Sequence, residues 1–551
     1  MITQSQLIEA GTVFGLLERQ AQIHGDRDLL VLPRAVQDHW GHDRDRLRYA
    51  EGLARSRALS AAYAAAGLGT GHRVALLLEN RPEHFIHWLA LNALGVSVVP
   101  VNPDYREDEL DYLLGHSEAV LLVRLAERAG QVDAVAARRS LPVIAPDEAP
   151  PQIAAPANED PPGPQTECAL VYTSGTTGRP KGCMLSNRYF LNWSWWYAAQ
   201  GGPIALRPGA ERLLTPLPTF HVNAMGHSFM GMLGSGGAQI IMDRFHPRQW
   251  WQTAIETGAT CFHYLGVMPA ILLELPESVA DRGHGMRFGL GGGVHPDHHA
   301  RFEARFGVPL LEGWAMTETG GAGSMCDTGE GAQGRHIGAR CIGRPDRPGP
   351  ALECRLVDDD GRPVARGEPG ELQLRAPGDD PRLGFFSGYL KDAAATEDAW
   401  RDGWLHTGDI MRQGPDGALF FVDRKKNIIR RSGENIAAAE VEAVIAPLDG
   451  VAQVAVTAAI DPLREEEVMA VIVAMEGADR AELADRVFDA CAGHLAYYKA
   501  PGFVVFTDRL PTTSTQKVQK AALREWAQDP LSAPGCIDLR ARKQALRKAR
   551  R

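Results

Sequence analysis

The sequence predicts an α/β protein built from a large N-terminal domain of helix-covered, mainly parallel sheets, a small β-rich subdomain and a small α+β C-terminal domain. Up to about residue 375, short apolar runs alternate with amphipathic stretches across short connections. Strands and helices in that order are typical of parallel sheets covered by helices. Beyond this point polar turns and short strands replace the pattern. The 551 residues also exceed the roughly 250–300 that one core supports, so we expect two or three domains.

The clearest alternation follows the first seventy residues. Three short apolar runs predict buried strands, at 72–80, 96–102 and 119–124. The two segments between them, 81–95 and 106–118, place apolar residues at helical spacing, and Gly95 ends the first of these helices. A Pro- and Ala-rich stretch at 149–165 predicts a surface connector before the next strand, 168–173.

The C-terminal part has the pattern of a compact α+β unit. Two stretches with helical spacing predict helices, at 437–448 and 481–495. Three apolar runs predict strands, at 451–460, 467–476 and 502–508. The preceding segment, 417–433, predicts short strands joined by polar turns. No repeat of about 20–50 residues is visible, which argues against a solenoid or a propeller.

Composition and charge argue against several classes of protein. The net charge of -10 disfavours a general nucleic-acid binder, which needs a basic surface. There is no signal-peptide pattern and no run of about eighteen apolar residues, so we expect a cytoplasmic protein without a membrane span. The eight scattered cysteines predict neither a disulfide framework nor a zinc site. The basic tail, 539–551, predicts a frayed, solvated helix end, with contact to an anionic surface as the alternative.

The loop after the strand at 168–173 has the composition of a phosphate-binding loop. Two glycines, Gly175 and Gly178, allow consecutive N–H groups to turn toward an anion. The polar donors of the loop are Thr173, Ser174, Thr176, Thr177 and Lys181. The usual Gly-Lys-Ser/Thr ending is absent, because Gly182 follows the lysine. A plain linker is the alternative, but the flanking strand and the compact Arg-Pro-Lys-Gly ending favour phosphate binding.

This loop resembles the phosphate loop of adenylate-forming enzymes, the family of acyl-CoA synthetases, non-ribosomal peptide adenylation domains and firefly luciferase. Four further segments match the family in its order and spacing, so that the resemblance covers most of the chain: 312–319, 403–409, 422–442 and 511–520. Three positions depart from the family pattern. Trp314 and Ala315 stand where Tyr and Gly are commoner, and Gln516 stands where Gly usually precedes the lysine.

The resemblance implies a reaction and roles for the matching residues. A carboxylate attacks the α-phosphate of ATP to give acyl-AMP and pyrophosphate, and a thiol then attacks the mixed anhydride. Loop 173–181 is expected to hold the β- and γ-phosphates. Individual roles are implied for six residues: α-phosphate and Mg²⁺ binding by Thr317 and Glu318, adenine stacking by Trp314, ribose binding by Asp409 and Arg424, and adenylation by Lys517.

The resemblance also implies contacts with the nucleotide or with CoA for a further group of residues. The glycines of the run at 289–294 are expected to let the backbone pass close to adenine: Gly291, Gly292 and Gly293. Nucleotide or CoA contacts are also implied for Glu312, Gly313, Phe421, Gly433 and Glu434. Each has a plainer alternative: a glycine run also makes a tight turn, Asp409 also suits a solvated turn, and Glu318 also suits a helix cap. Lys520 is interpreted as an ordinary surface lysine.

The acceptor of the acyl group is expected to be CoA. The segment Phe220–Asn223 holds no carboxylate for an amino group, and no carrier domain is seen after Lys517. His221 then matches the gate residue of acyl-CoA ligases near the substrate carboxylate, with a core histidine as the alternative. The nearest resemblance is to the crotonobetaine/carnitine-CoA ligase group. The expected partners are a small carboxylic acid, ATP, Mg²⁺ and CoA, without nucleic acid, and the sequence leaves a homodimer open.

The sequence leaves two rival functions and one question about the substrate. The enzyme could pass the acyl group to an acceptor other than CoA. A non-catalytic nucleotide- or acyl-binding protein is the second rival, but it should have lost one of five residues that are all present: Lys181, Glu318, Asp409, Arg424 and Lys517. The substrate question concerns a group of aromatic residues, which belong either to the core or to an acyl pocket. In a pocket they could make π contacts with the acid. They are Trp193, Trp195, Trp196, Phe262, His263 and Tyr264.

The resemblance also implies a division into two domains. Residues 1–424 are expected to form the ATP- and acyl-binding domain, and residues 425–551 a mobile C-terminal domain. The hinge is expected near Lys426, two residues after the ribose-binding arginine. Rotation about it would present Lys517 for adenylation and the face around Gly433 for attack by the thiol.

Overall fold

The computed structural model describes most of the chain and divides it into two compact units. The described residues are 3–154, 157–173, 179–294, 296–329, 334–345, 352–358, 360–424, 428–511 and 523–549. The first unit comprises Met1–Pro103, Leu114–Val171 and Gly182–Asp423. The second unit comprises Asp104–Leu113, Tyr172–Lys181 and Arg424–Arg551. The predicted hinge residue, Lys426, lies outside the described residues, so the hinge and the domain boundary stay predictions.

A seven-stranded sheet contains the strands predicted near the N-terminus. Its order is β18-β8-β7-β4-β3-β5-β6. The strands are β3 (Arg73–Leu77), β4 (Ser97–Pro100), β5 (Leu121–Arg124), β6 (Val143–Ile144), β7 (Glu167–Thr173), β8 (Lys181–Ser186) and β18 (Gly388–Tyr389). Strands β3 to β7 pair in parallel, and the connecting helices are α5 (Pro82–Asn92), α6 (Glu107–Ser117) and α7 (Ala129–Arg138). The predicted α/β class with parallel sheets is confirmed.

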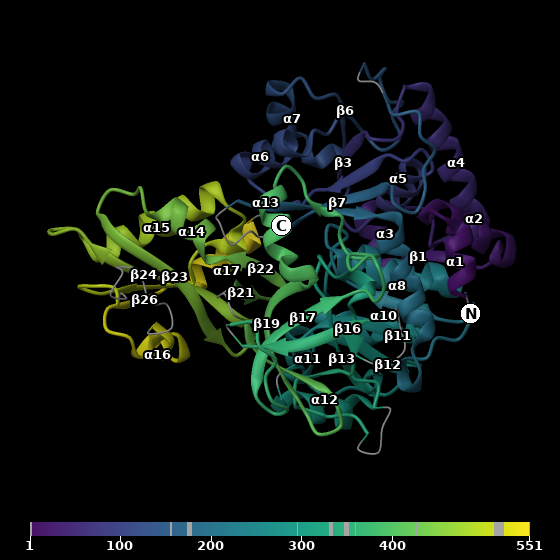
Figure 1. The fold of residues 1–551 in the computed structure, drawn as a ribbon. Helices are drawn as coiled ribbons and strands as arrows, with labels where there is room; N and C mark the ends of the chain where they lie inside the picture. Colours follow the sequence, from purple (N-terminus) through teal and green to yellow (C-terminus); the bar gives the residue numbers. More distant parts are fainter. Residues whose placement is uncertain are drawn as a thin grey trace. The chain divides into compact units, whose positions relative to one another are not determined.

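An eight-stranded sheet forms the second layer of the first unit, with the order β14-β13-β12-β11-β9-β10-β1-β2. Its strands are β1 (Asp28–Val31), β2 (Arg46–Arg48), β9 (Arg212–Thr215), β10 (Ala238–Ile241), β11 (Cys261–Leu265), β12 (Phe288–Gly292), β13 (Leu310–Trp314) and β14 (Met325–Cys326). All neighbours are parallel except the edge strands β2 and β14. Its helices include α8 (Asn187–Ala199), α10 (Trp250–Thr257), α11 (Val267–Leu273) and α12 (Pro296–Phe306), which Figure 1 labels beside these strands.

A five-stranded antiparallel sheet matches the predicted β-rich subdomain. Its order is β15-β20-β19-β17-β16. The strands are β15 (Cys341–Gly343), β16 (Glu353–Val357), β17 (Pro369–Arg375), β19 (Leu405–Gln413) and β20 (Leu419–Arg424).

The helix α5, which connects β3 and β4 of the seven-stranded sheet, lies deep in the core of the first unit. Every residue of α5 except Glu83 is buried, which is expected for a helix covered on all sides inside a large core.

One asparagine ties the carboxyl ends of strands from the two large sheets together. Asn80 follows β3, and its Nδ2 donates to the carbonyls of Leu217 and Met242, at 3.0 Å each. Its Oδ1 accepts from the backbone N–H of Thr219 at 2.8 Å. These bonds fix the segment that leads to His221 beside the carboxyl end of β3, the edge at which open α/β sheets bind their ligands.

The second unit contains the predicted α+β region. Its strands are β21 (Ile428–Arg431), β22 (Glu434–Ala437), β23 (Val451–Asp461), β24 (Glu465–Ala474), β25 (Phe503–Phe506) and β26 (Cys536–Asp538). They form the order β22-β21-β24-β25-β26, and β23 pairs with β24. Its helices are α14 (Ala438–Ile445), α15 (Arg480–His494), α16 (Arg524–Gln528) and α17 (Arg540–Ala549).

The basic C-terminal helix α17 differs from the expected frayed and solvated end. Leu539, just before it, lies in the core of the second unit. Lys543 is 1% exposed, and its Nζ lies 2.6 Å from Glu467 Oε1. Arg431 donates to the other oxygen of Glu467 at 2.7 Å. The buried Glu467 carboxylate therefore joins Lys543 of the helix to Arg431 of β21, an arrangement that the basic composition did not predict.

Candidate active site

The structure joins two predicted nucleotide-binding residues directly. Trp314 ends β13 and Asp409 lies within β19, so they come from two different sheets. The Trp314 Nε1–H donates to Asp409 Oδ2 at 2.8 Å. Trp314 is 6% exposed and Asp409 2% exposed. The backbone N–H of Asp409 also donates to Thr407 Oγ1 at 3.1 Å, which fixes the main chain that carries the carboxylate.

The predicted metal and phosphate ligands are held by residues that the sequence did not single out. The Tyr389 hydroxyl donates to Glu318 Oε1 at 2.8 Å, and Cys183 Sγ lies 3.9 Å from the same oxygen. The Tyr189 hydroxyl donates to the carbonyl of Thr317 at 2.8 Å. Burial and the Glu318 carboxylate raise the pKa of Tyr389, which keeps its proton available for this bond. No spacing rule connects Tyr389 with Glu318, and only the pairing of β18 with β8 brings the tyrosine close.

Glu318 fits a hard cation on the chemistry of its surroundings. It is 8% exposed, and its described contacts are neutral hydroxyl and thiol groups rather than a cation. Mg²⁺ is usually bound through one or two carboxylates plus substrate phosphates. The residues present therefore fit a Mg²⁺ site at this position.

Close packing between neighbouring strands and a turn account for glycines in the run at 289–294. A Cβ added at Gly291 would lie 2.2 Å from the carbonyl of Tyr264 on the neighbouring strand. Gly293 has a φ of 80°, in the left-handed region that favours glycine. Glu312 Oε1 accepts from the backbone N–H of Val294 at 3.1 Å, which links β13 to the end of this run. Burial raises the pKa of Glu312. A role of Gly291, Gly292 and Gly293 beside adenine stays a prediction.

Phe421 and Arg424 lie on the same strand, β20. The guanidinium of Arg340 is 5.2 Å from the centroid of the Phe421 ring, and the Phe421 N–H bonds to the Arg340 carbonyl at 3.0 Å. Arg424 ends the strand, but its side chain is outside the described part of the structure. Its predicted role at the ribose is therefore untested.

His221 comes just before a π-helix, Asn223–Met230. π-Helical turns are rare and occur frequently at functional sites. Within this helix, Ser228 Oγ lies 2.7 Å from His263 Nδ1, and the Tyr197 hydroxyl lies 2.8 Å from His263 Nε2. The sequence included His263 only as an aromatic neighbour and missed this network.

Two buried polar atoms of the same π-helix have no hydrogen-bond partner in the described structure: Asn223 Oδ1 and His227 Nε2. The His227 ring stacks on Trp193 at a centroid distance of 4.9 Å. Burial lowers the pKa of His227 to about 3, so the ring is neutral near neutral pH. Trp193, Trp196, Phe262, His263 and Tyr264 are all buried, and Trp195 is partly buried. Unpartnered buried polar atoms need an explanation, and a ligand group is one.

Several predicted residues belong to the second unit. Thr173 ends β7 and Lys181 begins β8, while Ser174, Gly175, Thr176, Thr177 and Gly178 lie outside the described residues. Between β21 and β22, Ser432 has a φ of 51° and Gly433 a φ of 86°, the two positive values of a tight hairpin turn. Glu434 begins β22. Lys517 lies outside the described residues.

Comparison with known families and proteins gives a consistent result. The model of the family described as "AMP-binding enzyme" matches residues 17–390, and that of the "AMP-binding enzyme C-terminal domain" matches residues 440–517. A sulfoacetate–CoA ligase from Cupriavidus necator is 32% identical over 84% of this chain and 89% of its own. A feruloyl-CoA synthase from an Amycolatopsis species is 33% identical over 88% and 94%. A crotonobetaine/carnitine–CoA ligase from Escherichia fergusonii is 30% identical over 83% and 89%.

Two solved structures have a fold similar to that of this chain. The o-succinylbenzoate CoA synthetase from Bacillus subtilis superposes with a TM-score of 0.77 at 24% identity, over 93% of this chain and 98% of its own, which shows the shared fold. An ATP-bound structure of MatB from Rhodopseudomonas palustris superposes with a TM-score of 0.62 at 26% identity, over 94% and 99%. Among the described residues, no helix is both long and apolar enough to cross a membrane.

Proposed function

This chain belongs to the AMP-binding enzyme family, and we propose on that premise that it is an ATP-dependent carboxylate–CoA ligase. It activates a carboxylic acid as acyl-AMP with release of pyrophosphate, and then forms acyl-CoA and AMP. The observation that carries the proposal is the bond between Trp314 and Asp409, because the two bonded residues are those that we expect to bind adenine and ribose. The three CoA-ligase relatives, each aligned over more than four fifths of this chain, support CoA as the acceptor.

In the first step a carboxylate oxygen attacks the α-phosphorus of ATP and pyrophosphate leaves. Two anions must approach each other, so the chain has to supply position and positive charge. We assign the β- and γ-phosphates to Thr173, Lys181 and the loop between them. Lys517 supplies a further cation, worth about 4 kcal/mol at about 4 Å from a phosphate at an intermediate dielectric. When bound at Glu318 and Thr317, Mg²⁺ supplies positive charge beside the phosphate oxygens.

In the second step the thiol of CoA attacks the acyl carbon and AMP leaves. We propose that residues 425–551 rotate about Lys426 between the two steps, because a few hinge residues suffice for such a motion. The tight turn at Gly433 would then face the pantetheine arm, with Glu434 beside it. The assignment of the two steps to two positions of residues 425–551 rests on the family resemblance. A Lys517 variant tests it, because this lysine is expected to act only in the first step.

The substrate acid is proposed to enter beside His221. The buried, unpartnered Asn223 Oδ1 and His227 Nε2 favour an acid that carries a polar group away from its carboxylate. The acids named for the three relatives are sulfoacetate, crotonobetaine or carnitine, and ferulate, and each of them carries such a group. We place the enzyme in the cytoplasm.

The experiment that tests this function is a panel of acids with the full chain, ATP, Mg²⁺ and CoA. The panel contains the acids named above, with acetate and a long-chain fatty acid for comparison. We expect at least one polar acid to give AMP, pyrophosphate and acyl-CoA in equal amounts, only when CoA is present. Pyrophosphate without acyl-CoA would favour an acceptor other than CoA. Nucleotide binding without pyrophosphate from any acid would favour a non-catalytic binding protein.

A further inference from the structure

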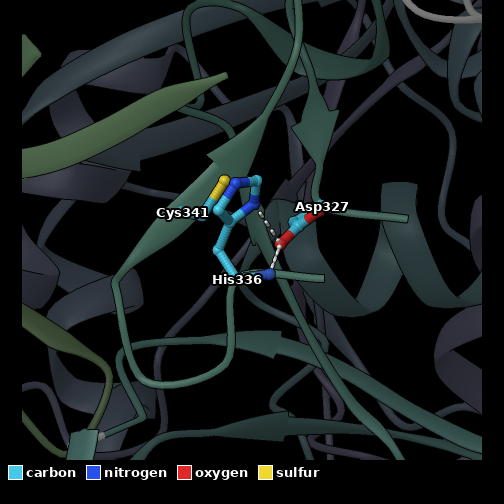
Figure 2. A group of neighbouring side chains, drawn as sticks. All are labelled: Asp327, His336 and Cys341. Carbon is cyan, nitrogen blue, oxygen red and sulfur yellow. Dashed lines mark hydrogen bonds and ion pairs between the residues drawn. The ribbon is translucent and has the colours of Figure 1, made fainter. Parts of the chain in front are cut away.

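A cluster of three unlike metal-binding side chains lies in the first unit, outside the residues assigned above. Asp327 follows β14, His336 lies in the segment 334–340, and Cys341 begins β15. One ligand atom of each lies within 4.8 Å of the other two, and Figure 2 shows the three side chains converging. Inspection of cysteine spacing misses this cluster, because its members come from three different segments and include a carboxylate.

Backbone and side-chain bonds already orient the two polar ligands. Asp327 Oδ2 accepts from the backbone N–H of His336 at 2.7 Å, and Oδ1 accepts from that of Gly329 at 3.2 Å. His336 Nδ1 lies 3.3 Å from Asp327 Oδ2, as the dashed lines of Figure 2 show. The other ring nitrogen, Nε2, lies 3.3 Å from Asp416 Oδ2. A carboxylate on the second nitrogen of a metal-binding histidine is the usual way to fix its tautomer and orientation.

The cluster is largely removed from solvent but remains reachable. Cys341 is 2% exposed, and the side chains of His336 and Asp327 are 18% and 14% exposed. The His336 and Phe420 rings pack nearly at right angles, with their centroids 5.2 Å apart, which limits the rotation of the imidazole. A site that is held in place before binding loses little conformational entropy on binding.

The charges around the cluster favour a cation. Two carboxylates, Asp327 and Asp416, approach the His336 ring from opposite nitrogens. The nearby Arg335 is engaged by both oxygens of Glu303, at 2.6 and 2.8 Å. The Cys341 sulfur, which releases its proton on metal binding, forms with the imidazole and the carboxylate a donor set that suits Zn²⁺. This ion takes sulfur, nitrogen and oxygen ligands in tetrahedral geometry.

We propose that Asp327, His336 and Cys341 bind a Zn²⁺ ion, with His336 bound through Nδ1 and Asp416 as its positioning residue. Water fills the fourth position. The site lies beside the strand that carries Trp314, because β14 pairs with β13 and the Asp327 N–H bonds to the Glu312 carbonyl at 3.1 Å. The ion therefore has a structural role: it clamps β14 to β15 next to the nucleotide-binding strand.

The test measures zinc binding by the full chain, freed of metal by a chelator, in the absence of nucleotide. Cys341→Ser removes the soft ligand with little change in volume. Cys354→Ser is the matched control, because Cys354 is a partly buried cysteine of the same five-stranded sheet, on β16. The readouts are bound zinc per chain, the thiolate-to-metal charge-transfer band of the Co²⁺ form, and the zinc-dependent shift of the melting temperature.

We expect the wild type and Cys354→Ser to bind one Zn²⁺ per chain, to show the Co²⁺ band and to melt at a higher temperature with zinc. Cys341→Ser should bind zinc about 100-fold more weakly and lack the band, while its melting temperature without metal stays near that of the wild type. Asp416→Asn should weaken binding about 10-fold and keep the band. Zinc binding that is equal in the wild type and Cys341→Ser, or absent from both, would overturn the proposal and leave only a hydrogen-bonded cluster. If Cys341→Ser fails to fold, His336→Gln takes its place with the same readouts.

Discussion

The indole Nε1 of Trp314 lies 2.8 Å from Oδ2 of Asp409, so one hydrogen bond joins the end of β13 to the middle of β19. The bond is buried and its acceptor is a carboxylate, which makes it stronger than a bond between neutral groups. A tyrosine, which is commoner in the family at position 314, would present its donor at a different place on the ring. The Trp314–Asp409 pair is therefore a feature of this chain that sets the direction of the carboxylate expected to bind the ribose.

Trp314→Phe should weaken nucleotide binding. The phenyl ring can still stack, but Asp409 loses its indole donor, and a hydrogen bond to a charged group contributes about 1.5–3 kcal/mol. We expect the dissociation constant for ATP to rise about 10-fold or more, measured by calorimetry. Trp196→Phe is the matched control, because its Nε1 donates to the neutral carbonyl of Ser324 at the same distance, 2.8 Å. Equal ATP affinities of the two variants would contradict the role of the pair.

Glu318→Gln should slow pyrophosphate release by about 100-fold, because one charged oxygen ligand becomes a neutral amide in a site that works by electrostatics. The fold should be retained, since Gln keeps an oxygen for the Tyr389 hydroxyl. Tyr389→Phe is the control: it removes the hydroxyl that positions Glu318 but keeps the carboxylate, so its rate should fall much less. A folded Glu318→Gln variant with the wild-type rate across Mg²⁺ concentrations would rule out Glu318 as the ligand.

Lys517→Ala should separate the two half-reactions. Because this lysine is expected to act on the phosphates alone, acyl-AMP formation should fall by orders of magnitude, while synthetic acyl-AMP and CoA should still give thioester at nearly the wild-type rate. Lys520→Ala serves as the control, at a nearby lysine to which the sequence assigns no role. Lys426→Pro, which fixes φ at one value, should slow the thioester step more than adenylation. Equal losses in both steps for Lys517→Ala would make this lysine structural.

Acidic pH should destabilise the first unit through buried histidines. Burial lowers the pKa of His84 and of His227 to about 3 and that of His87 to about 4, whereas in the unfolded chain each takes up a proton near pH 6.5. Between these values the unfolded state binds more protons, so the free energy of unfolding falls as the pH falls. Each histidine contributes up to about 1.4 kcal/mol per pH unit below 6.5.

The matching variant is His84→Leu, which removes a buried ring whose Nε2 has no partner in the described structure. Chemical denaturation between about pH 5 and 6.5 should show a shallower loss of stability than in the wild type. His39→Ala, at an exposed histidine, should keep the wild-type slope. An unchanged slope in His84→Leu would show that this ring does not contribute.

The sequence predicted elements where local pattern decides the outcome. The strands β3, β4 and β5 and the helices α5 and α6 lie where apolar runs and helical spacing indicated. Contacts between distant segments have no such local signal. The bond from Tyr389 to Glu318, and the approach of Cys341 to His336 and Asp327, depend on strand pairing that a single sequence does not display.

The basic tail also shows that a local pattern does not reveal contacts between distant segments. Its composition indicated a solvated helix end, and the helix α17 is present. Lys543 is nevertheless buried, because Glu467 on β24 meets it inside the second unit. A charged residue becomes a core residue when the fold supplies its partner, and that partner is 76 positions away in the chain.

The most direct test of the central claim follows a carboxylate oxygen. A substrate acid found in the panel is labelled with oxygen-18 in its carboxylate and converted by the full chain with ATP and CoA, and the products are examined by mass spectrometry. Attack of the carboxylate on the α-phosphorus, followed by attack of the thiol on the acyl carbon, transfers one labelled oxygen to the phosphate of AMP. The account predicts one oxygen-18 in each AMP and none in pyrophosphate. Label in inorganic phosphate with formation of ADP, or AMP without label, would contradict it.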